Sequence, residues 1–312
     1  MMHVDFLLLV VGIALLVKGA DWFVRGSSDV AYFFKISPFV VGLTIVAFGT
    51  SAPEAAVSMI AALRGQAELS YGNIVGSSMA NLLLVLGLSA ILTPIAIRTR
   101  IIKKEFPFAI FIVLMVLLFT IIGAEYLNRI EGFLLLVIFA VFMTMLFKSI
   151  RTEKKEATPI RAVPAVKRSI VILILGLSGI VIGGNLTTTH ASNIAVELGM
   201  SERLVGLSIV AVGTSLPELA TIIASWLKKE NDIAIGNIIG SNIFNLAFVL
   251  GISASLEPIA LSRIMRIDMV MLLVVTLIAY WFAITGKILT KLEGSMLVIL
   301  YVAYLTFVII RN

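Results

Sequence analysis

The sequence predicts an all-α integral membrane protein in which ten transmembrane helices form two inverted repeats of five helices each. Three features carry this prediction: the composition, the number of long apolar runs, and a duplicated motif. The chain of 312 residues is 60% hydrophobic and has a mean hydropathy of +1.10. A soluble protein of this length cannot bury so much apolar surface, so lipid must cover part of it.

Ten apolar runs are long enough to cross a bilayer core, which is about 30 Å thick and needs roughly 20 helical residues. These predicted spans are residues 5–24, 38–63, 70–93, 105–123, 130–148, 168–190, 203–227, 233–256, 267–285 and 292–310. The first run has no basic segment before it, which favours a retained helix over a cleaved signal peptide. Glycine, proline and polar residues interrupt the second, third, seventh and eighth spans. The fourth, fifth, ninth and tenth are plainer and are expected to be packing helices.

The distribution of basic residues predicts the orientation. With the N-terminus outside and Lys18 inside the first span, 17 of the 24 Lys and Arg residues fall in cytoplasmic loops and six fall outside. This excess agrees with the positive-inside rule. The prediction is a multi-pass protein of the cell membrane with both termini outside and the charged stretch 149–168 in the cytoplasm. The first repeat then covers residues 1–150, a linker covers 151–167, and the second repeat covers 168–312.

A duplicated motif relates the two halves. At an offset of 164 positions, residues 37–97 align with residues 201–261 without a gap, and nearly half of the aligned residues are identical. The identities concentrate at glycine, proline and polar positions, which chance similarity between apolar segments does not favour. Five spans per half is an odd number, so the second half enters the membrane from the opposite side. Inverted repeats of this kind are typical of secondary transporters, whose sites lie near the midplane at interrupted helices.

A proline breaks each copy of the motif, in "GTSAPE" and in "GTSLPE". Pro53 has no N–H to donate, and its ring presses on the carbonyl four residues earlier. Pro217 does the same in the second copy. The carbonyls that lose ordinary helical partners belong to Ala47, Gly49, Thr50, Ala211, Gly213 and Thr214. Such groups are tolerated at membrane depth only where protein, water or an ion satisfies them.

Oxygen-bearing side chains accompany each break. Glu54 follows Pro53 directly, and Ser51 lies three residues before Glu54 on nearly the same helix face. The third span adds a hydroxyl and an amide one turn apart, and the second half supplies an equivalent set. The side chains are those of Ser51, Glu54, Ser77, Asn81, Ser215, Glu218, Ser241 and Asn245. A set of oxygen ligands without nitrogen or sulfur suits hard cations such as Ca²⁺ and Na⁺.

The two glutamates are the strongest site candidates, because an acid near the centre of a bilayer costs roughly 2.5–3.5 kcal/mol. The segments "GNIVG" and "GNIIG" are interpreted mainly as packing faces, since Gly-x-x-x-Gly lets helices approach closely. Four other charged residues lie near span ends and are expected to snorkel or to pair. They are Lys18, Asp21, Glu125 and Asp268.

The composition argues against other classes of function. The chain has no cysteine and only two histidines, so thiol chemistry and a histidine-built metal or catalytic centre are not expected. No Ser–Lys arrangement on facing spans appears, which argues against an intramembrane enzyme. The net charge of +6 is attributed to cytoplasmic loops rather than to a nucleic-acid partner. No cofactor is predicted. The expected partners are the transported ions and the lipid bilayer, and the compact symmetric chain is expected to work as a monomer.

The paired sequences "GTSAPE…GNIVGSSMAN" and "GTSLPE…GNIIGSNIFN" resemble the two alpha repeats of the cation/calcium exchangers, specifically the sodium/calcium exchangers. The resemblance covers essentially the whole chain. It implies an antiporter that exchanges Na⁺ for Ca²⁺ by alternating access, with the first and sixth spans sliding across a fixed bundle. By this resemblance Glu54 and Glu218 bind Ca²⁺, helped by the carbonyls of Thr50 and Thr214. The implied sodium sites use Ser51, Ser77, Ser215, Ser241 and the carbonyls of Ala47 and Ala211, and Asn81 and Asn245 complete the centre.

Two departures from the family pattern narrow the prediction. Many relatives have an aspartate at the position of Asn245, and in the potassium-dependent branch that acid is associated with K⁺ transport, so its absence argues against potassium coupling. Residues 149–168 are too short to replace the large regulatory domain of animal exchangers. The charges of Glu54 and Glu218 balance one Ca²⁺ or two Na⁺, and a third Na⁺ leaves a net +1, which predicts electrogenic exchange. Because two nearby carboxylates repel each other, an empty site is expected to hold a proton.

Three alternatives stay open. A proton/calcium exchanger on the same scaffold also carries paired glutamates, although the serines of this sequence favour sodium. A potassium-dependent exchanger is the second alternative. A passive channel is the third, and it would need no counter-ion on the opposite side of the membrane.

Overall fold

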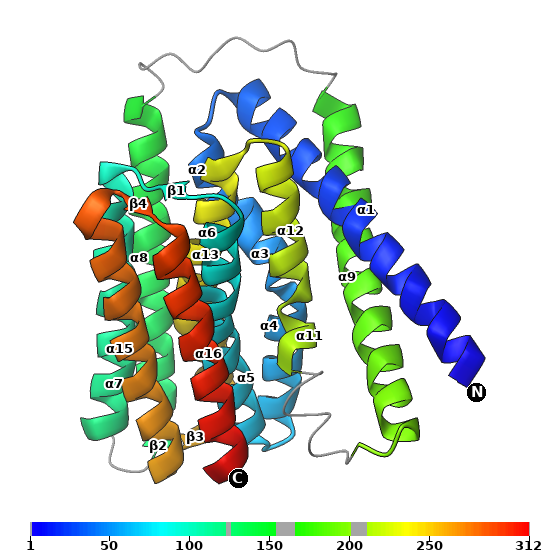
Figure 1. The fold of residues 1–312 in the computed structure, drawn as a ribbon. Coiled ribbons are helices and arrows are strands. Elements are labelled where there is room, and N and C mark those ends of the chain that lie inside the picture. The colour runs from blue at the N-terminus through cyan, green and yellow to red at the C-terminus, as the bar shows by residue number, and fades with distance from the viewer. Residues whose placement is uncertain (1, 123–125, 154–165, 201–210, 312) are drawn as a thin grey trace. The chain divides into compact units, whose positions relative to one another are not determined.

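The computed structural model describes residues 2–122, 126–153, 166–200 and 211–311, and these residues are almost entirely helical (Figure 1). Eight helices in this part of the chain are long and apolar enough to cross a membrane. A bent pair, Pro38–Thr50 with Ala52–Leu63, raises that number to nine if it counts as one span. The predicted seventh span lies partly outside the described residues, and its described end contains the shorter apolar helix Leu216–Leu227. The all-α membrane fold is confirmed, and the total of ten spans stays a prediction.

The helices pack into two compact units, and neither unit coincides with one half of the sequence. Unit 1 contains the described residues of Met1–Thr50, Thr152–Asn237 and Ile299–Asn312. Unit 2 contains those of Ser51–Arg151 and Ile238–Val298. Each unit therefore combines segments from the first and the second half of the chain. The repeat boundaries near residues 150 and 168 stay a prediction about the sequence and do not describe the packing.

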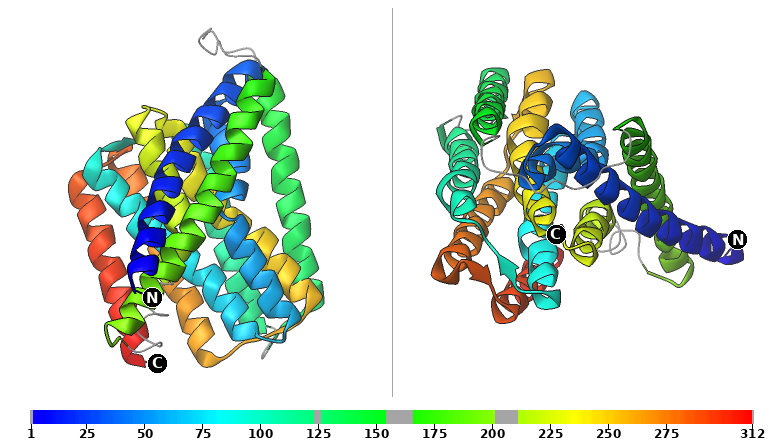
Figure 2. Two further views of the ribbon diagram at one scale, coloured as in Figure 1. Left: turned by 90° about the vertical axis from the view of Figure 1, so that its right-hand side faces the viewer. Right: turned by 90° about the horizontal axis from the view of Figure 1, so that it is seen from above.

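Unit 1 is built around two long antiparallel helices, α1 (Met2–Phe34) and α9 (Val166–Glu197), which cross each other (Figures 1 and 2). A helix of 33 residues is about 50 Å long, so α1 exceeds the thickness of a bilayer core. The shorter elements of this unit are α2 (Pro38–Val41), the π-helical turn η1 (Gly42–Val46), α3 (Ala47–Thr50), α11 (Ala211–Thr214) and α12 (Leu216–Leu227). Pro38 opens α2 at its first turn, where a proline needs no N–H partner.

The crossing of α1 and α9 depends on glycine. A Cβ atom on Gly19 would lie 2.6 Å from the backbone nitrogen of Ile180, and one on Gly12 would lie 2.7 Å from that of Thr187. No side chain can be accommodated at these distances, so the two backbones approach as closely as small residues allow. The buried apolar cluster beside this crossing includes Leu16, Ala20, Phe23, Val24 and Ile180.

The contacts between α1 and α9 repeat at the offset of 164 that relates the two halves of the sequence. The equivalent close approaches are Gly12 to Thr187 and Gly176 to Phe23, and then Gly19 to Ile180 and Gly183 to Leu16. The same rule holds for two hydrogen bonds, Asn193 to Asp5 at 2.9 Å and Ser169 to Asp29 at 3.4 Å. Because each contact made by one helix has its counterpart on the other, this crossing has local two-fold symmetry.

Unit 2 contains two long helices that each include a π-helical turn. The first runs through α5 (Ala67–Ala80), η2 (Asn81–Val85) and α6 (Leu86–Leu92). The second begins with α13 (Asn231–Ile243), which contributes to both units, and continues through η5 (Phe244–Val249) and α14 (Leu250–Leu256). The other helical elements are α4 (Ala52–Leu63), η3 (Ile101–Glu105), α7 (Phe106–Ile122) and α15 (Arg263–Gly286), with α8 (Arg129–Glu153) and α16 (Lys291–Arg311) contributing to both units.

Two short antiparallel strand pairs lie at opposite ends of unit 2 (Figure 1). Strand β1 (Ile95–Ala96) pairs with β4 (Ile288–Leu289), and β2 (Tyr126–Leu127) pairs with β3 (Ile259–Ala260). Strands β1 and β3 occupy equivalent positions at the offset of 164. These pairs satisfy backbone groups at helix ends, and the hydropathy pattern does not predict them.

Candidate functional site

The two predicted proline breaks are present in the backbone. Ser51 separates α3 from α4 with φ −87° and ψ 6°, and Ser215 separates α11 from α12 with φ −89° and ψ 2°. Each serine carbonyl accepts a hydrogen bond from the amide four residues later, at 3.0 Å. Pro53 and Pro217 lie in the first turns of α4 and α12, where the missing N–H is tolerated. The same sequence motif therefore forms the same local conformation twice.

Ten of the twelve predicted site residues are buried. They are Ala47, Thr50, Ser51, Glu54, Ser77, Asn81, Ser215, Glu218, Ser241 and Asn245. Thr214 is half-buried, and the side chain of Ala211 lies outside the described part of the structure. Both glutamates are only 1% exposed. An ionised carboxylate at such burial needs a compensating cation, a proton or strong hydrogen bonds.

Unit 1 carries Glu218 together with polar residues from both halves of the sequence. Glu218 lies in the first turn of α12, and α12 packs against α3 and α9. The hydroxyl of Thr50, the last residue of α3, donates a hydrogen bond to the amide oxygen of Asn237 at 3.1 Å. The predicted site residues in this unit are Ala47, Thr50, Ala211, Thr214, Ser215 and Glu218.

Unit 2 carries Glu54 and the remaining predicted residues. Helix α4 packs against α5, η5 and α14, so the helix that bears Glu54 contacts both the helix of Ser77 and the π-helical turn of Asn245. Asn81 begins η2 and Asn245 is the second residue of η5. Local π-helical turns occur frequently at functional sites because they widen the helix and redirect side chains. The predicted residues in this unit are Ser51, Glu54, Ser77, Asn81, Ser241 and Asn245.

Two asparagines contact this machinery although they were not among the predicted site residues. The side-chain amide of Asn73 donates to the carbonyl of Glu54 at 3.1 Å and to the hydroxyl of Ser58 at 2.8 Å. Asn237, at the equivalent position of the second motif, accepts from Thr50. The signal was present in the sequence as the duplicated asparagine of "GNIVG" and "GNIIG".

The sequence predicts a packing role for the glycines of "GNIVG" and "GNIIG". This prediction is correct for Gly236 and wrong for Gly72 and Gly76. A Cβ atom on Gly236 would lie 2.8 Å from the backbone nitrogen of Leu43. Gly72 and Gly76 have no atom within 4 Å of such a position. The Gly-x-x-x-Gly pattern of the first motif therefore does not mark a close helix contact within the described residues.

Two of the charged residues near span ends find partners as expected. Asp21 forms an ion pair with Lys228 at 2.7 Å, and the ammonium of Lys18 lies 5.7 Å from the centre of the Trp22 ring. Glu125 lies outside the described residues. The side chains of Lys18, Asp21 and Lys228 make these contacts in unit 1, away from the helix breaks at Ser51 and Ser215.

Buried acids at two equivalent breaks in apolar helices define an integral membrane transport protein. Residues 4–148 and 168–310 match the protein family described as "Sodium/calcium exchanger protein", and the chain belongs to this family. The resemblance found in the motifs is thereby confirmed.

Individual relatives match over nearly the full length. The chain is 39% identical over 320 aligned residues to "Putative antiporter CaxA" of Alkalimonas amylolytica. This alignment covers 97% of this chain and 98% of the relative. It is 32% identical to "Sodium/calcium exchanger MaX1" of Methanosarcina acetivorans, with 98% of both chains covered. A solved structure of the sodium-calcium exchanger NCX_Mj superposes with a TM-score of 0.85 at 32% identity, covering 98% of this chain and 99% of that chain.

Proposed function

We propose that the chain is a secondary active antiporter that exchanges Na⁺ for Ca²⁺ across the membrane. The observation that carries the proposal is the pair of equivalent helix breaks at Ser51 and Ser215, each followed three residues later by a buried glutamate. The names of the MaX1 relative and of the NCX_Mj structure, both sodium/calcium exchangers, support the choice of ions. Both ions are transported substrates, and the mechanism requires no resident cofactor.

The residues of the two breaks have distinct roles in this proposal. Glu54 and Glu218 bind Ca²⁺ through their carboxylates, with the carbonyls of Thr50 and Thr214 as further ligands. Oxygen ligands of this number and charge suit Ca²⁺, which accepts irregular coordination by six to eight oxygens. Na⁺ competes for part of the same set. Its ligands are the hydroxyls of Ser51, Ser77, Ser215 and Ser241 and the carbonyls of Ala47 and Ala211, next to the amides of Asn81 and Asn245.

Charge balance explains the coupling. Two carboxylates neutralise either one Ca²⁺ or two Na⁺, and a third Na⁺ gives the loaded site a net charge of +1. The empty carrier would have to move two bare carboxylates past apolar side chains, so it resists crossing unless protons bind. Exchange therefore requires a cation in each direction, is electrogenic with three Na⁺, and is inhibited at low pH.

Many secondary transporters achieve alternating access with inverted repeats, and we propose ten spans arranged as two such repeats. The antiparallel crossing of α1 and α9, with contacts that repeat at the offset of 164, supports this arrangement. The excess of basic residues in alternate loops supports an orientation with both termini outside and residues 149–168 in the cytoplasm of a cell-membrane protein. The protein is proposed to work as a monomer.

Uptake of ⁴⁵Ca²⁺ into proteoliposomes tests the proposal directly. Vesicles are loaded with Na⁺, with K⁺, or with an acidic buffer, and Ca²⁺ uptake is started by dilution into medium without that ion. The Na⁺-loaded vesicles are diluted into medium with and without K⁺. We expect saturable uptake driven by the outward Na⁺ gradient and none with K⁺ alone. Uptake driven by the proton gradient but not by Na⁺ would instead identify a proton/calcium exchanger. Uptake that needs no counter-ion would identify a channel, and dependence on K⁺ together with Na⁺ would identify a potassium-dependent exchanger.

The membrane current separates the possible stoichiometries. With three Na⁺ per Ca²⁺ each cycle moves one net charge, so Na⁺-driven Ca²⁺ uptake should produce a current that changes with membrane potential. A current that stays at zero across a range of potentials, while ⁴⁵Ca²⁺ uptake continues, would show exchange of two Na⁺ per Ca²⁺.

A further inference from the structure

We infer that Asn73 and Asn237 are positioning residues that hold the two sides of the helix break at Ser51. The inference rests on the proposed function and deepens it, because it concerns how the cation ligands next to Ser51 are kept in place. Neither asparagine is itself a proposed cation ligand. Each acts through a neighbour, Asn73 through the turn that carries Glu54 and Asn237 through Thr50.

Asn73 holds the turn that carries the carboxylate. Its amide donates to the carbonyl of Glu54 at 3.1 Å and to the hydroxyl of Ser58 at 2.8 Å. A backbone carbonyl only accepts hydrogen bonds, so the NH₂ group of Asn73 must point at α4. Glu54 and Ser58 lie one turn apart on α4, and two bonds to one turn fix both its height and its rotation. The direction in which the Glu54 side chain leaves α4 therefore depends on Asn73.

Asn237 holds the other side of the same break. The hydroxyl of Thr50 donates to the amide oxygen of Asn237 at 3.1 Å, and both residues are fully buried. The alternative acceptor for this hydroxyl, the carbonyl of Ala47, is farther away at 3.4 Å. Thr50 ends α3 immediately before Ser51, so a fixed Thr50 side chain also fixes the orientation of its carbonyl, the proposed Ca²⁺ ligand.

The arrangement is specific to the first break rather than a general packing feature. At the offset of 164 the counterpart of Ser58 is Ile222, which has no hydroxyl to accept a hydrogen bond. The two asparagines of the duplicated motif thus have different partners, one on α4 and one on α3. Both contacts lie next to Ser51 in the chain, where the ligand geometry depends on a short irregular segment instead of a continuous helix.

The test compares cation affinity with maximal transport rate. Asn73→Leu keeps the size of the side chain and removes both donated hydrogen bonds, whereas Ser58→Ala removes only one of them. Since a hydrogen bond contributes about 0.5–1.5 kcal/mol, each lost bond should raise the half-saturating Ca²⁺ concentration about two- to tenfold. We expect the order Asn73→Leu above Ser58→Ala above wild type, with the maximal rate of Na⁺-driven uptake largely retained.

A second pair tests Asn237 in the same way. Thr50→Val removes the hydroxyl and keeps the carbonyl, so it should raise the half-saturating Ca²⁺ concentration, as Asn237→Leu should. The double variant should raise it by less than the sum of the two single changes, because both remove one shared interaction. Gly72→Ala, next to Asn73, where nothing lies within 4 Å of the added methyl group, serves as the control with unchanged affinity.

The possible results separate this inference from the proposed function. Variants that unfold at lower temperature but keep wild-type affinities for Ca²⁺ and Na⁺ would overturn the positioning role. The positioning role would also be overturned if the effects of Thr50→Val and Asn237→Leu on Ca²⁺ affinity were fully additive in the double variant. If the wild-type protein itself shows no Na⁺-driven Ca²⁺ uptake, the proposed function fails before these variants are compared. Ser58→Ala and Thr50→Val are small changes, so the test does not depend on the leucine variants folding.

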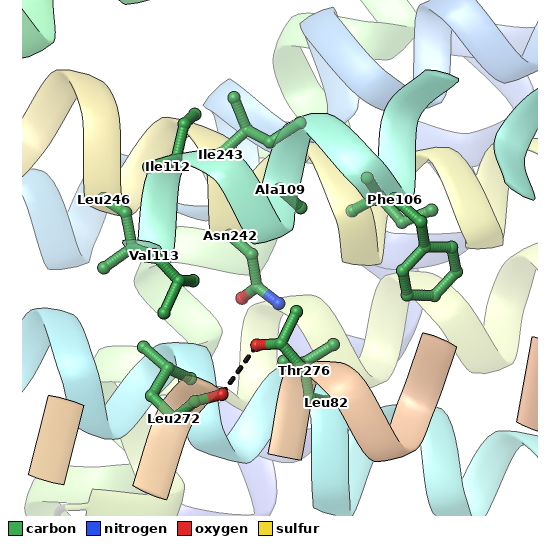
Figure 3. Close-up of a pocket in the computed structure, with 11 residues that line it drawn as sticks. Leu82, Phe106, Ala109, Ile112, Val113, Asn242, Ile243, Leu246, Leu272 and Thr276 are labelled. Atoms are coloured by element: carbon green, nitrogen blue, oxygen red, sulfur yellow. Dashed lines mark hydrogen bonds between the residues drawn. The ribbon is translucent and has the colours of Figure 1, made fainter. Parts of the chain in front are cut away.

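A second inference comes from a cavity within unit 2, between η2, α7, α15 and the part of α13 and η5 around Asn242 (Figure 3). Its walls are mostly apolar, but the amide of Asn242 points into it toward Thr276 (Figure 3). Asn242 is 5% exposed, and its amide oxygen has no hydrogen-bond partner among the described residues. The hydroxyl of Thr276 donates to the carbonyl of Leu272 at 2.7 Å and keeps lone pairs for another donor.

We propose that this cavity binds one water molecule between Asn242 and Thr276. Its volume of about 10 Å³ is that of a single water site. The water would donate to the Asn242 oxygen and to the Thr276 hydroxyl, and it would accept from the Asn242 NH₂ group. In the first motif the residue equivalent to Asn242 is Ser78, whose hydroxyl donates to the carbonyl of Ile74 on its own helix at 2.9 Å. This hydroxyl therefore needs no bridging water.

Crystals of the protein, native and pressurised with xenon, test the water site. We expect a density peak within hydrogen-bond distance of both Asn242 and Thr276 and no xenon in this cavity, because dry apolar cavities bind xenon and hydrated ones do not. In a double-mutant cycle of Asn242→Leu and Thr276→Val, the changes in unfolding temperature should be non-additive. Xenon bound in the native cavity, or additive effects of the two changes, would overturn the proposal.

Discussion

Glu54 and Glu218 each place a buried carboxyl group in the first turn of a mostly apolar helix. Replacing either one with glutamine keeps the shape and removes the charge. Because removal of one partner from a buried charge pair costs about 3–5 kcal/mol, we expect Ca²⁺ affinity to fall roughly 100-fold or more in each variant. Na⁺-driven ⁴⁵Ca²⁺ uptake in proteoliposomes and calorimetric Ca²⁺ binding measure this loss.

Glu257→Gln is the matched control for these variants. Glu257 is a glutamate of the same chain that stays half exposed and lies 3.6 Å from Arg129. Exposed ion pairs contribute little, so its loss should leave uptake unchanged. Wild-type Ca²⁺ affinity in Glu54→Gln or in Glu218→Gln would show that the proposed carboxylate site is wrong.

The charge of the site also depends on two residues that carry none. Asn81 and Asn245 are buried within the π-helical turns η2 and η5, and an aspartate at either position would change the fixed charge of the proposed site from −2 to −3. A site with three carboxylates needs one more monovalent cation for neutrality. Amides at both positions therefore favour exchange of Na⁺ for Ca²⁺ without an additional ion.

At the scale of the elements, the breaks at Ser51 and Ser215 each separate a threonine at the end of one helix from a glutamate in the first turn of the next. Pro53→Ala restores an N–H that can donate to the carbonyl of Gly49 and so lets one continuous helix form. We expect a gain in stability well below the roughly 3 kcal/mol that a proline inside a helix costs, because Pro53 lies in the first turn of α4. Ca²⁺ affinity should fall roughly tenfold, because in a continuous helix the carbonyl of Thr50, a proposed ligand, would accept a hydrogen bond from the amide of Glu54.

Thermal unfolding in detergent and calorimetric Ca²⁺ binding measure the two effects of Pro53→Ala separately. Pro38→Ala is the control, because Pro38 opens α2 at its first turn and interrupts nothing. It should leave both quantities close to those of the wild type. Unchanged Ca²⁺ affinity in Pro53→Ala would show that the break contributes no ligand.

The crossing of α1 and α9 gives a prediction about stability. A methyl group on Gly176 would meet the backbone of Phe23, and a backbone clash cannot be relieved by rotation of a side chain. Gly176→Ala should therefore lower the free energy of unfolding by about 1–3 kcal/mol, the usual cost of overpacking. Gly76→Ala, with no neighbour within 4 Å, should be neutral or slightly stabilising because alanine favours helix. Equal unfolding temperatures for both variants would contradict the close backbone contact.

The sequence predicts elements better than it predicts their contacts. The length and composition of the apolar runs are sufficient to predict the membrane helices. Pro53 and Pro217 mark both breaks, because a proline has no N–H to donate in any surroundings. The bonds of Asn73 to α4 were missed because a Gly-x-x-x-Gly segment reads as packing, and only the rotation of α5 decides which way its amide points. The π-helical turns were missed for a similar reason: one extra residue in a helical turn leaves no clear mark in a hydropathy pattern.

At the scale of the whole molecule, duplication accounts for features that no single segment explains. The glycine contacts of α1 and α9 and the positions of β1 and β3 follow the same offset as the motif. The compact units nevertheless mix the halves, so the duplicated segments exchange neighbours rather than folding as two separate domains. Of the two proposed site glutamates, Glu218 lies in unit 1 and Glu54 lies in unit 2.

The proposed orientation can be tested because the chain contains no cysteine. Single cysteines are introduced at exposed positions on the two predicted sides, Lys103→Cys and Lys291→Cys for the cytoplasm, and Arg64→Cys and Glu257→Cys for the outside. A membrane-impermeant maleimide added to intact cells should label the last two and spare the first two, since basic residues remain on the cytoplasmic side during insertion. In inside-out vesicles the pattern should reverse, and permeabilised cells provide the control that all four thiols react. Labelling of Lys103→Cys from outside would contradict the proposed orientation. Labelling of Arg64→Cys and Glu257→Cys from opposite sides would rule out the inverted repeat, because these positions follow the second and the eighth predicted spans and an even number of spans separates them.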